Sequence, residues 1–167
     1  MHFPKFLNVS WLLALMIVSN ALFGRGSLHA QESDSNEGIS EAEKEAVQKA
    51  RNPEEKLKAY LDIANERMKV IYSATHKEKG DELAQAVAGF RSALNSAEEL
   101  VAGEQASKGT GKKMTETLLK ATRKYNASLL EILRKASEDL RKYIQSAFEV
   151  SERVADGLAL QLEKNSH

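Results

Sequence analysis

The stretch from Lys112 to Glu163 contains no proline and a single glycine, and it constrains the fold more than any other part of the sequence. Apolar or small side chains recur along it at steps of three and four residues, the period of an α-helix with one buried stripe. The stripe consists of Leu118, Thr122, Tyr125, Leu129, Ile132, Ala136, Leu140, Tyr143, Ala147, Val150, Val154 and Leu158. About fifty residues are therefore predicted to be helical and to pack against a core that the preceding chain supplies.

One irregularity in the stripe leaves two architectures open. Between Ile132 and Leu140 the steps are four and four, a stutter in coiled-coil terms, so the stripe shifts around the helix. Either one long helix bends near Ala136, or the chain reverses between Lys135 and Glu138. That segment has neither glycine nor proline, and Ser137 is its one plausible cap, so turn chemistry favours the single helix. The predicted fold is all-α, an elongated antiparallel helical bundle of three main helices with a long C-terminal helix. The alternative is a four-helix up-down bundle.

Three further helices are predicted upstream, each from its own start and stop signals. Ser40 with Glu43 three residues later forms a capping box. Asn52 followed by Pro53 is typical of a helix start. Gly80 is expected to supply a left-handed turn residue. The predicted ranges are Glu41 to Arg51, Pro53 to about His76, and Glu82 to about Ser107, and the glycine-containing segment 108–111 is predicted to be a turn between helices.

The composition argues for a binding protein rather than an enzyme. The chain has 167 residues, a formal net charge of zero and no cysteine. A thiol nucleophile, a cysteine-ligated metal and a disulfide are therefore excluded. Beyond the first thirty residues the only histidines are His76 and His167, too few for a histidine metal site or a Ser-His-Asp triad. No catalytic residue, cofactor site or metal site is predicted.

The first thirty residues have the order of a secretory signal peptide. Lys5 precedes an apolar stretch whose uninterrupted part, Trp11 to Val18, is short for a membrane span of about twenty residues. A small residue, Ala30, stands at the expected cleavage site, with Ala21 as a second choice. The predicted organisation is a signal peptide at 1–30, a flexible leader at 31–39 and a single helical-bundle domain at 40–167. Export to the periplasm or the medium follows, and anchoring by an uncleaved signal is the alternative.

Basic residues concentrate in one region. Residues 108–142 hold ten basic side chains against four acidic ones, whereas residues 31–66 hold five against ten. The two regions are expected either to face one another or to be solvated, and the alternative is an anion-binding face for an envelope polymer or a membrane surface. Few aromatics lie among the basic positions, so nucleic acid is not the expected partner. The candidate anion-binding residues are Lys112, Lys113, Lys120, Arg123, Lys124, Arg134, Lys135, Arg141 and Lys142.

A long C-terminal helix would also leave apolar residues uncovered. Helices of about 25 residues span roughly 40 Å and cannot cover a helix of about fifty. The far half would then bind a second copy or a helical protein partner. The candidate residues for this contact are Tyr143, Phe148, Val150, Val154 and Leu158.

The segment Asn52 to Arg67 (NPEEKLKAYLDIANER) resembles the openings of small, secreted, all-helical bacterial proteins of unknown function. The resemblance implies a cell-envelope setting and no activity. Together with the composition, it leads us to expect a non-catalytic interaction or scaffold module of the envelope, with binding of an anionic polymer or membrane surface through residues 108–142 as the alternative function.

The signal architecture makes one direct prediction. The mature protein is expected to begin at Gln31, because cleavage after Ala30 removes the apolar segment. Amino-terminal sequencing of the native protein measures this. A chain that still begins at Met1 and sediments with membranes would establish the anchored alternative instead.

Overall fold

The computed structural model describes residues 38–105 and 109–164, and this part of the chain is helical without any strand. Its five helices are α2 (Glu41–Lys49), α3 (Pro53–His76), α4 (Gly80–Glu104), α5 (Thr110–Lys135) and α6 (Glu138–Lys164). The all-α prediction is confirmed. The predicted signal peptide and most of the predicted leader lie outside the described residues. None of the helices in the described ranges is long and apolar enough to cross a membrane.

The first two helix starts follow the predicted caps. The backbone N–H of Ser40 donates to Glu43 Oε2 at 2.7 Å, while the Ser40 hydroxyl oxygen accepts from the Glu43 N–H at 3.4 Å. At α3, Asn52 Oδ1 accepts from the Glu55 N–H at 2.8 Å, and Pro53 occupies the first turn. Each cap satisfies a backbone donor that the first helical turn would otherwise leave unpaired.

The prediction of a continuous helix from Lys112 to Glu163 is wrong. The structure contains the four long helices of the alternative prediction. The chain reverses at Ala136, whose ψ of 144° is extended, and its N–H still donates to the Ile132 carbonyl at 3.0 Å. The carbonyl of Ser137 then accepts from the Leu140 N–H at 3.1 Å and so begins α6. The shift of the stripe at Ala136 therefore marked a turn, not a bend, because reversal lets α6 bury its own apolar side.

The turn between α3 and α4 uses a different residue from the predicted one. Glu78, not Gly80, has the positive φ, at 53°, and Gly80 is the first residue of α4. The Lys79 N–H donates to the Ala74 carbonyl at 2.9 Å, and the Glu78 N–H donates to the Thr75 carbonyl at 3.3 Å. These are the two bonds of a Schellman motif, and they satisfy carbonyls at the end of α3.

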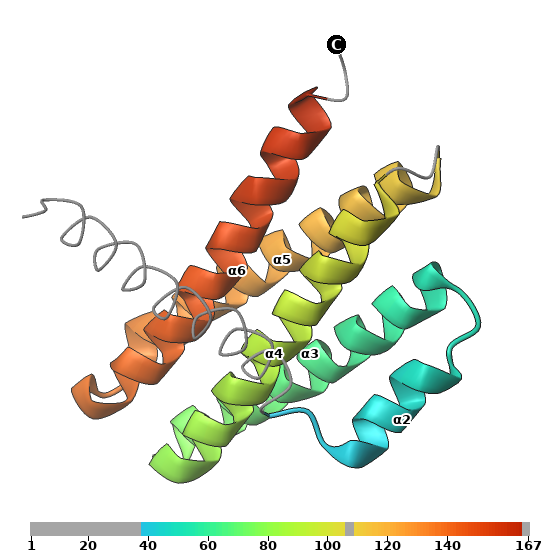
Figure 1. The fold of residues 1–167 in the computed structure, drawn as a ribbon. Coiled ribbons are helices and arrows are strands. Elements are labelled where there is room, and N and C mark those ends of the chain that lie inside the picture. Colours follow the sequence, from blue (N-terminus) through green and yellow to red (C-terminus); the bar gives the residue numbers. More distant parts are fainter. Residues whose placement is uncertain (1–37, 106–108, 165–167) are drawn as a thin grey trace, which may run out of the picture. The chain divides into compact units, whose positions relative to one another are not determined.

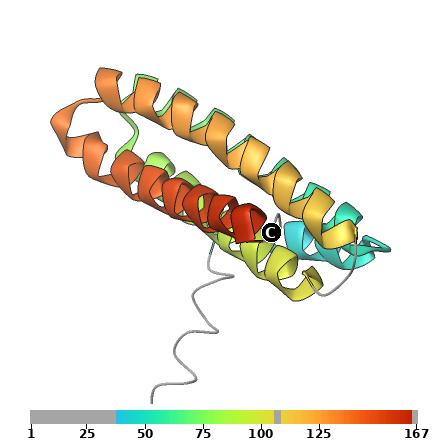
Figure 2. The same ribbon diagram turned by 90° about the horizontal axis from the view of Figure 1, so that it is seen from above.

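The four long helices form two antiparallel hairpins, α3–α4 and α5–α6 (Figure 1). Figure 2 shows the second hairpin covering the first, with α5 over α3 and α6 over α4. The stacked helices run in the same direction: Leu140 near the start of α6 lies beside Gly80 of α4, and Lys113 near the start of α5 pairs with Glu54 of α3. The short α2 packs against α3, where Arg67 and Glu43 form an ion pair at 2.7 Å.

The core lies between the two hairpins and takes in most of the predicted stripe. Phe90, Leu94, Leu118, Leu129 and Ile144 are fully buried there. Val154 and Leu158 are also buried, at 0% and 2% exposure. Tyr143, Phe148 and Val150 are half-buried against the core. The premise of an uncovered apolar strip on α6 is therefore wrong, because α4 and α5 cover it.

Core truncations should be costly. Leu94→Ala and Leu129→Ala are each expected to lower the free energy of unfolding by about 2–5 kcal/mol, because both side chains are fully buried and leave a cavity. Val154→Glu should prevent folding, because it buries an unpaired charge. Urea denaturation followed by circular dichroism measures these effects. Leu160→Ala is the matched control, since Leu160 is 57% exposed; losses below about 1 kcal/mol at both core leucines would contradict the assigned core.

Candidate functional site

The bundle is open along one side, between α3 and α5. Of the helix pairs stacked across the two hairpins, α4 and α6 pack closely, whereas α3 and α5 contact each other less. The α4–α6 side is also bridged by Arg153, which donates to Glu98 at 2.7 Å and to Asn95 at 2.8 Å. Three hollows follow one another along the α3–α5 side, and we call them together the α3–α5 groove.

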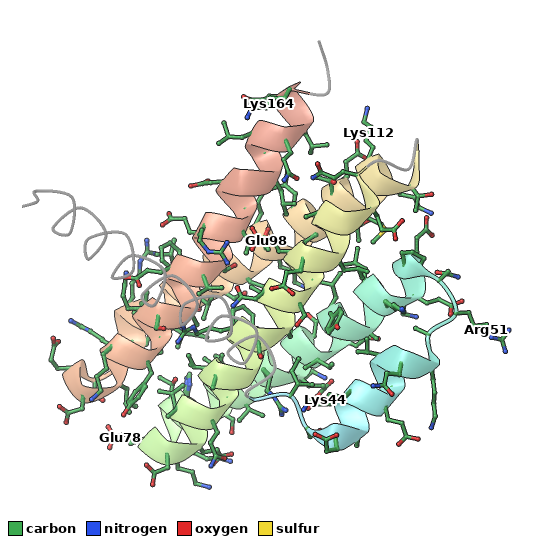
Figure 3. All side chains as sticks on the ribbon, in the orientation of Figure 1. Lys44, Arg51, Glu78, Glu98, Lys112 and Lys164 are labelled. Atoms are coloured by element: carbon green, nitrogen blue, oxygen red, sulfur yellow. The ribbon has the colours of Figure 1, made fainter. Side chains whose placement is uncertain are left out.

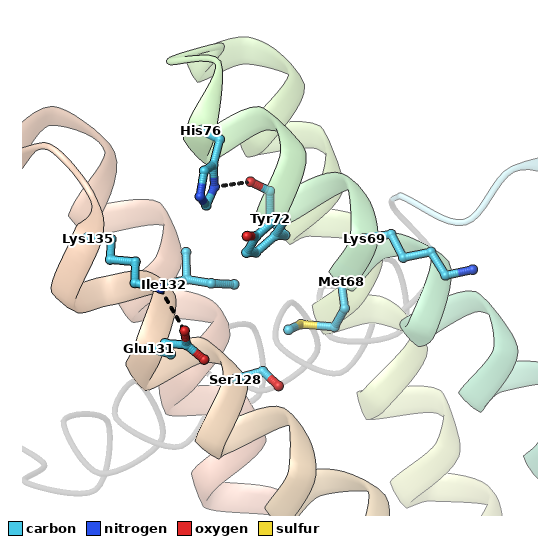
Figure 4. A pocket seen from close by; sticks show the side chains of 8 residues that line it. All are labelled: Met68, Lys69, Tyr72, His76, Ser128, Glu131, Ile132 and Lys135. Atoms are coloured by element: carbon cyan, nitrogen blue, oxygen red, sulfur yellow. Dashed lines mark hydrogen bonds and ion pairs between the residues drawn. The ribbon is translucent and has the colours of Figure 1, made fainter.

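The hollow near the carboxyl ends of α3 and α5 is mostly apolar. It has a volume of about 400 Å³, and Met68, Tyr72 and Ile132 point into it (Figure 4). Tyr72 is 52% exposed and stacks on His76, with ring centroids 4.2 Å apart. Tyr72 therefore forms a wall of this hollow and not part of the core.

Charged pairs stand at the edge of this hollow. Lys135 donates to Glu131 at 2.7 Å, and this hydrogen bond lowers the pKa of Glu131 and raises the pKa of Lys135. On α3, Lys69 pairs with Glu66 at 2.6 Å. The floor of the hollow is thus apolar and its edges are ionic, which suits an amphipathic occupant.

Tyr125 stands in the middle of the groove and holds its two walls together. Its hydroxyl donates to Asn65 Oδ1 at 3.1 Å and approaches the Leu61 carbonyl at 3.4 Å, both on α3. Its ring meets Phe90 of α4 edge-on, with centroids 5.3 Å apart. Burial, together with the charge of Asp62, raises the pKa of Tyr125 to about 12. The phenol therefore stays protonated, and can bridge α3 to α5, well above neutral pH.

The outer face of α5 is rich in basic side chains. Helix α5 carries seven basic and two acidic side chains, and all nine candidate anion-binding residues of α5 and α6 are exposed. Three pairs of adjacent basic residues recur every eleven positions on α5. Eleven residues turn a helix by three full turns plus about 20°, so the pairs stack on one face about 16 Å apart. We call this face the basic ladder; its pairs are Lys112–Lys113, Arg123–Lys124 and Arg134–Lys135.

The two rows of the ladder differ in how they are paired. Lys113 and Lys135, on the groove side, bind Glu54 and Glu131. Lys112, Arg123 and Arg134 have no ion-pair partner among the residues that the structure describes, and neither does Lys124. Figure 3 shows Lys112 extending from the start of α5. The predicted pairing of the basic region with the acidic one is thus confined here to Lys113 and Glu54.

The last two predicted basic residues lie apart from the ladder, on α6. Arg141 donates to Glu138 at 3.0 Å, and Lys142 lies over the ring of Tyr143 at 4.9 Å. Both follow the reversal at Ala136 and therefore do not continue the α5 rows. The sequence alone could have revealed the ladder, since its signal is the eleven-residue spacing of basic pairs rather than the net charge of the region.

The described residues contain no group of three or more His, Asp or Glu side chains arranged to hold a metal ion. His76, the one histidine within the described ranges, ends α3, and its Nδ1 lies 3.0 Å from the Tyr72 carbonyl. Comparisons of the chain with protein-family models, with curated proteins and with solved structures find no match.

The raised pKa of Tyr125 predicts a loss of stability at high pH. The unfolded chain releases the phenol proton near pH 10.0 and the folded chain only near pH 12, so the stabilisation is present below pH 10 and is lost as the pH rises towards 12. The free energy of unfolding of the native protein should therefore fall more steeply over this range than that of Tyr125→Phe. Urea denaturation at a series of pH values measures both curves. Parallel curves would contradict the burial of the phenol.

Proposed function

We propose that this chain is a non-catalytic interaction or scaffold module of the cell envelope, and that it binds a linear anionic polymer along the basic ladder of α5. The observation that carries the proposal is the eleven-residue repeat of basic pairs. It holds six cations on one exposed face of a single helix, over about 35 Å. Export of the protein remains an expectation from its sequence.

The arrangement suits an extended polyanion better than a compact anion. A small phosphate or carboxylate ligand needs several donors converging on one point, but the ladder spreads its pairs about 16 Å apart. A polymer with a charge on every repeating unit can contact all three pairs at once. It gains affinity by releasing the counterions that it held in solution.

The other candidate partner of this face is an anionic membrane surface. Helices that lie in a membrane interface combine basic residues with aromatic or leucine side chains that enter the acyl region. The exposed face of α5 has one large apolar side chain in the described range, Leu130, at 41% exposure, and no exposed aromatic. The polymer is therefore the favoured partner.

Charge reversal on the unpaired row tests the proposal. Lys112→Glu, Arg123→Glu and Arg134→Glu together should weaken binding of a soluble poly(glycerol phosphate) by at least about tenfold at low salt, because each lost contact removes one counterion-release step. They should also flatten the dependence of affinity on salt. Isothermal titration calorimetry at several salt concentrations measures both quantities.

The matched control variant reverses the charge of three exposed lysines outside the ladder by Lys58→Glu, Lys77→Glu and Lys164→Glu. These lysines likewise have no ion-pair partner among the described residues. This variant has the same net charge as the ladder variant. If the two lose equal affinity, the ladder is not the site, and only overall charge matters. Binding to anionic phospholipid vesicles without binding to the polymer would replace the polymer with a membrane as the partner.

A further inference from the structure

We infer that the α3–α5 groove binds a second copy of this chain, with Leu160 of that copy seated in the hollow lined by Met68, Tyr72 and Ile132. The inference is independent of polymer binding. It begins from two features that the fold leaves unused: an apolar hollow at the open side of the bundle, and an exposed leucine on another helix of the same chain.

Leu160 is the most exposed of the large apolar side chains in the described residues, at 57%. It lies on the solvent side of α6, whose other side buries Val154 and Leu158. Helix α6 takes no part in the groove, so a molecule cannot place its own Leu160 there. A second molecule can, because both features are exposed.

The charges around the two features are complementary. Leu160 is flanked on its own face by Asp156, four residues before it, and by Glu163 and Lys164, three and four residues after it, and all three are exposed. Earlier on α6 the exposed acids Glu149 and Glu152 continue this acidic face, while the intervening Arg153 is already bound to Glu98. An approaching α6 therefore brings an apolar side chain with three carboxylates on its amino-terminal side, while Glu163 and Lys164 follow it with opposite charges.

The α5 edge of the groove offers the opposite charge. Lys124 lines the α5 side of the middle hollow, of about 540 Å³, which shares Met68, Lys69 and Ser128 with the apolar hollow. The carboxylates Asp62 and Glu66 line its α3 side, where Glu66 is paired with Lys69. Lys124 is exposed and has no ion-pair partner among the described residues. An α6 helix seated with Leu160 in the apolar hollow thus places Asp156 or Glu163 on the side where Lys124 stands, about one turn along.

The contact joins two different surfaces, so it is heterologous. A dimer still has a free groove on one copy and a free Leu160 on the other, so association can continue into chains. The interface is a single helix face against a groove, smaller than the standard interface of about 1,600 Å². Association is therefore weak and depends on protein concentration, and salt weakens it further.

Sedimentation equilibrium of the purified native protein, from about 1 µM to about 1 mM, covers the range of such weak contacts. The average mass should rise with concentration. Leu160→Glu and Tyr72→Glu should each weaken association by at least about tenfold, because each removes the apolar contact. Leu130→Glu is the matched control and should associate as the native protein does, because Leu130 lies on α5 away from the groove-lining residues.

Mixing the two deficient variants tests the heterologous geometry. Leu160→Glu retains its groove and Tyr72→Glu retains its leucine, so the mixture should form one-to-one dimers that grow no further. Lys124→Glu should weaken association, and Asp156→Lys or Glu163→Lys in the same chain should restore part of it. Circular dichroism confirms that each variant is folded, and Leu160→Glu should bind the anionic polymer as well as the native protein does.

Three results would overturn the inference: a native protein that is monomeric over the whole range, a Leu130→Glu variant that loses association as much as Leu160→Glu, or a mixture of the two deficient variants that stays monomeric. The last result would indicate a two-fold contact that uses one surface twice. None of these results bears on the basic ladder, because polymer is absent from the experiment.

Discussion

The structure depends on the burial of the apolar side of α6, which the chain achieves by reversing at Ala136. Val154 and Leu158 would face water in a continuous helix, but the turn brings them between α4 and α5. The turn takes two residues, Ala136 and Ser137, out of helical geometry, which costs a few backbone hydrogen bonds. This cost is small compared with the free energy gained by burying a whole helix face. The Ser137 carbonyl and the extended Ala136 backbone are enough to make the turn, so neither glycine nor proline is needed.

The open side of the bundle follows from the size of the side chains on each helix. Helix α4 has small residues where it meets its neighbours, among them Ala86, Ala93 and Ala97, so other helices approach it closely. Gly89 is the extreme case, because a side chain there would collide with Arg67, which lies against it and reaches the Gly38 carbonyl. Between α3 and α5 stand Met68, Tyr125 and Ile132 instead, and Tyr125 spans the gap with its hydroxyl. Large side chains between parallel helices leave hollows that small ones would not.

Local signals predicted the parts of the fold that local chemistry decides. The capping box at Ser40 and the start of α3 at Asn52 and Pro53 are confirmed, because a cap is made by residues within one turn. The reversal at Ala136 was predicted only as the alternative to a continuous helix, and the left-handed Glu78 was not predicted, because tertiary packing chose both against turn propensity. The candidate site divides in the same way. The basic ladder could be identified from the sequence by its spacing, whereas the groove depends on how far apart α3 and α5 lie.

Lys124 belongs to both surfaces, and this couples them. It is one of the six ladder cations and it also lines the middle hollow of the groove. A polyanion on the ladder and the acidic face of a second α6 would both be drawn to this ammonium group, which a single carboxylate or phosphate can neutralise. By thermodynamic linkage, if bound polymer lowers the affinity of the groove for α6, then bound α6 lowers the affinity of the ladder for the polymer by the same factor. Because Leu160 contacts only the apolar hollow, the coupling acts through charge and should fade as salt screens the lysine, while the apolar part of the contact remains.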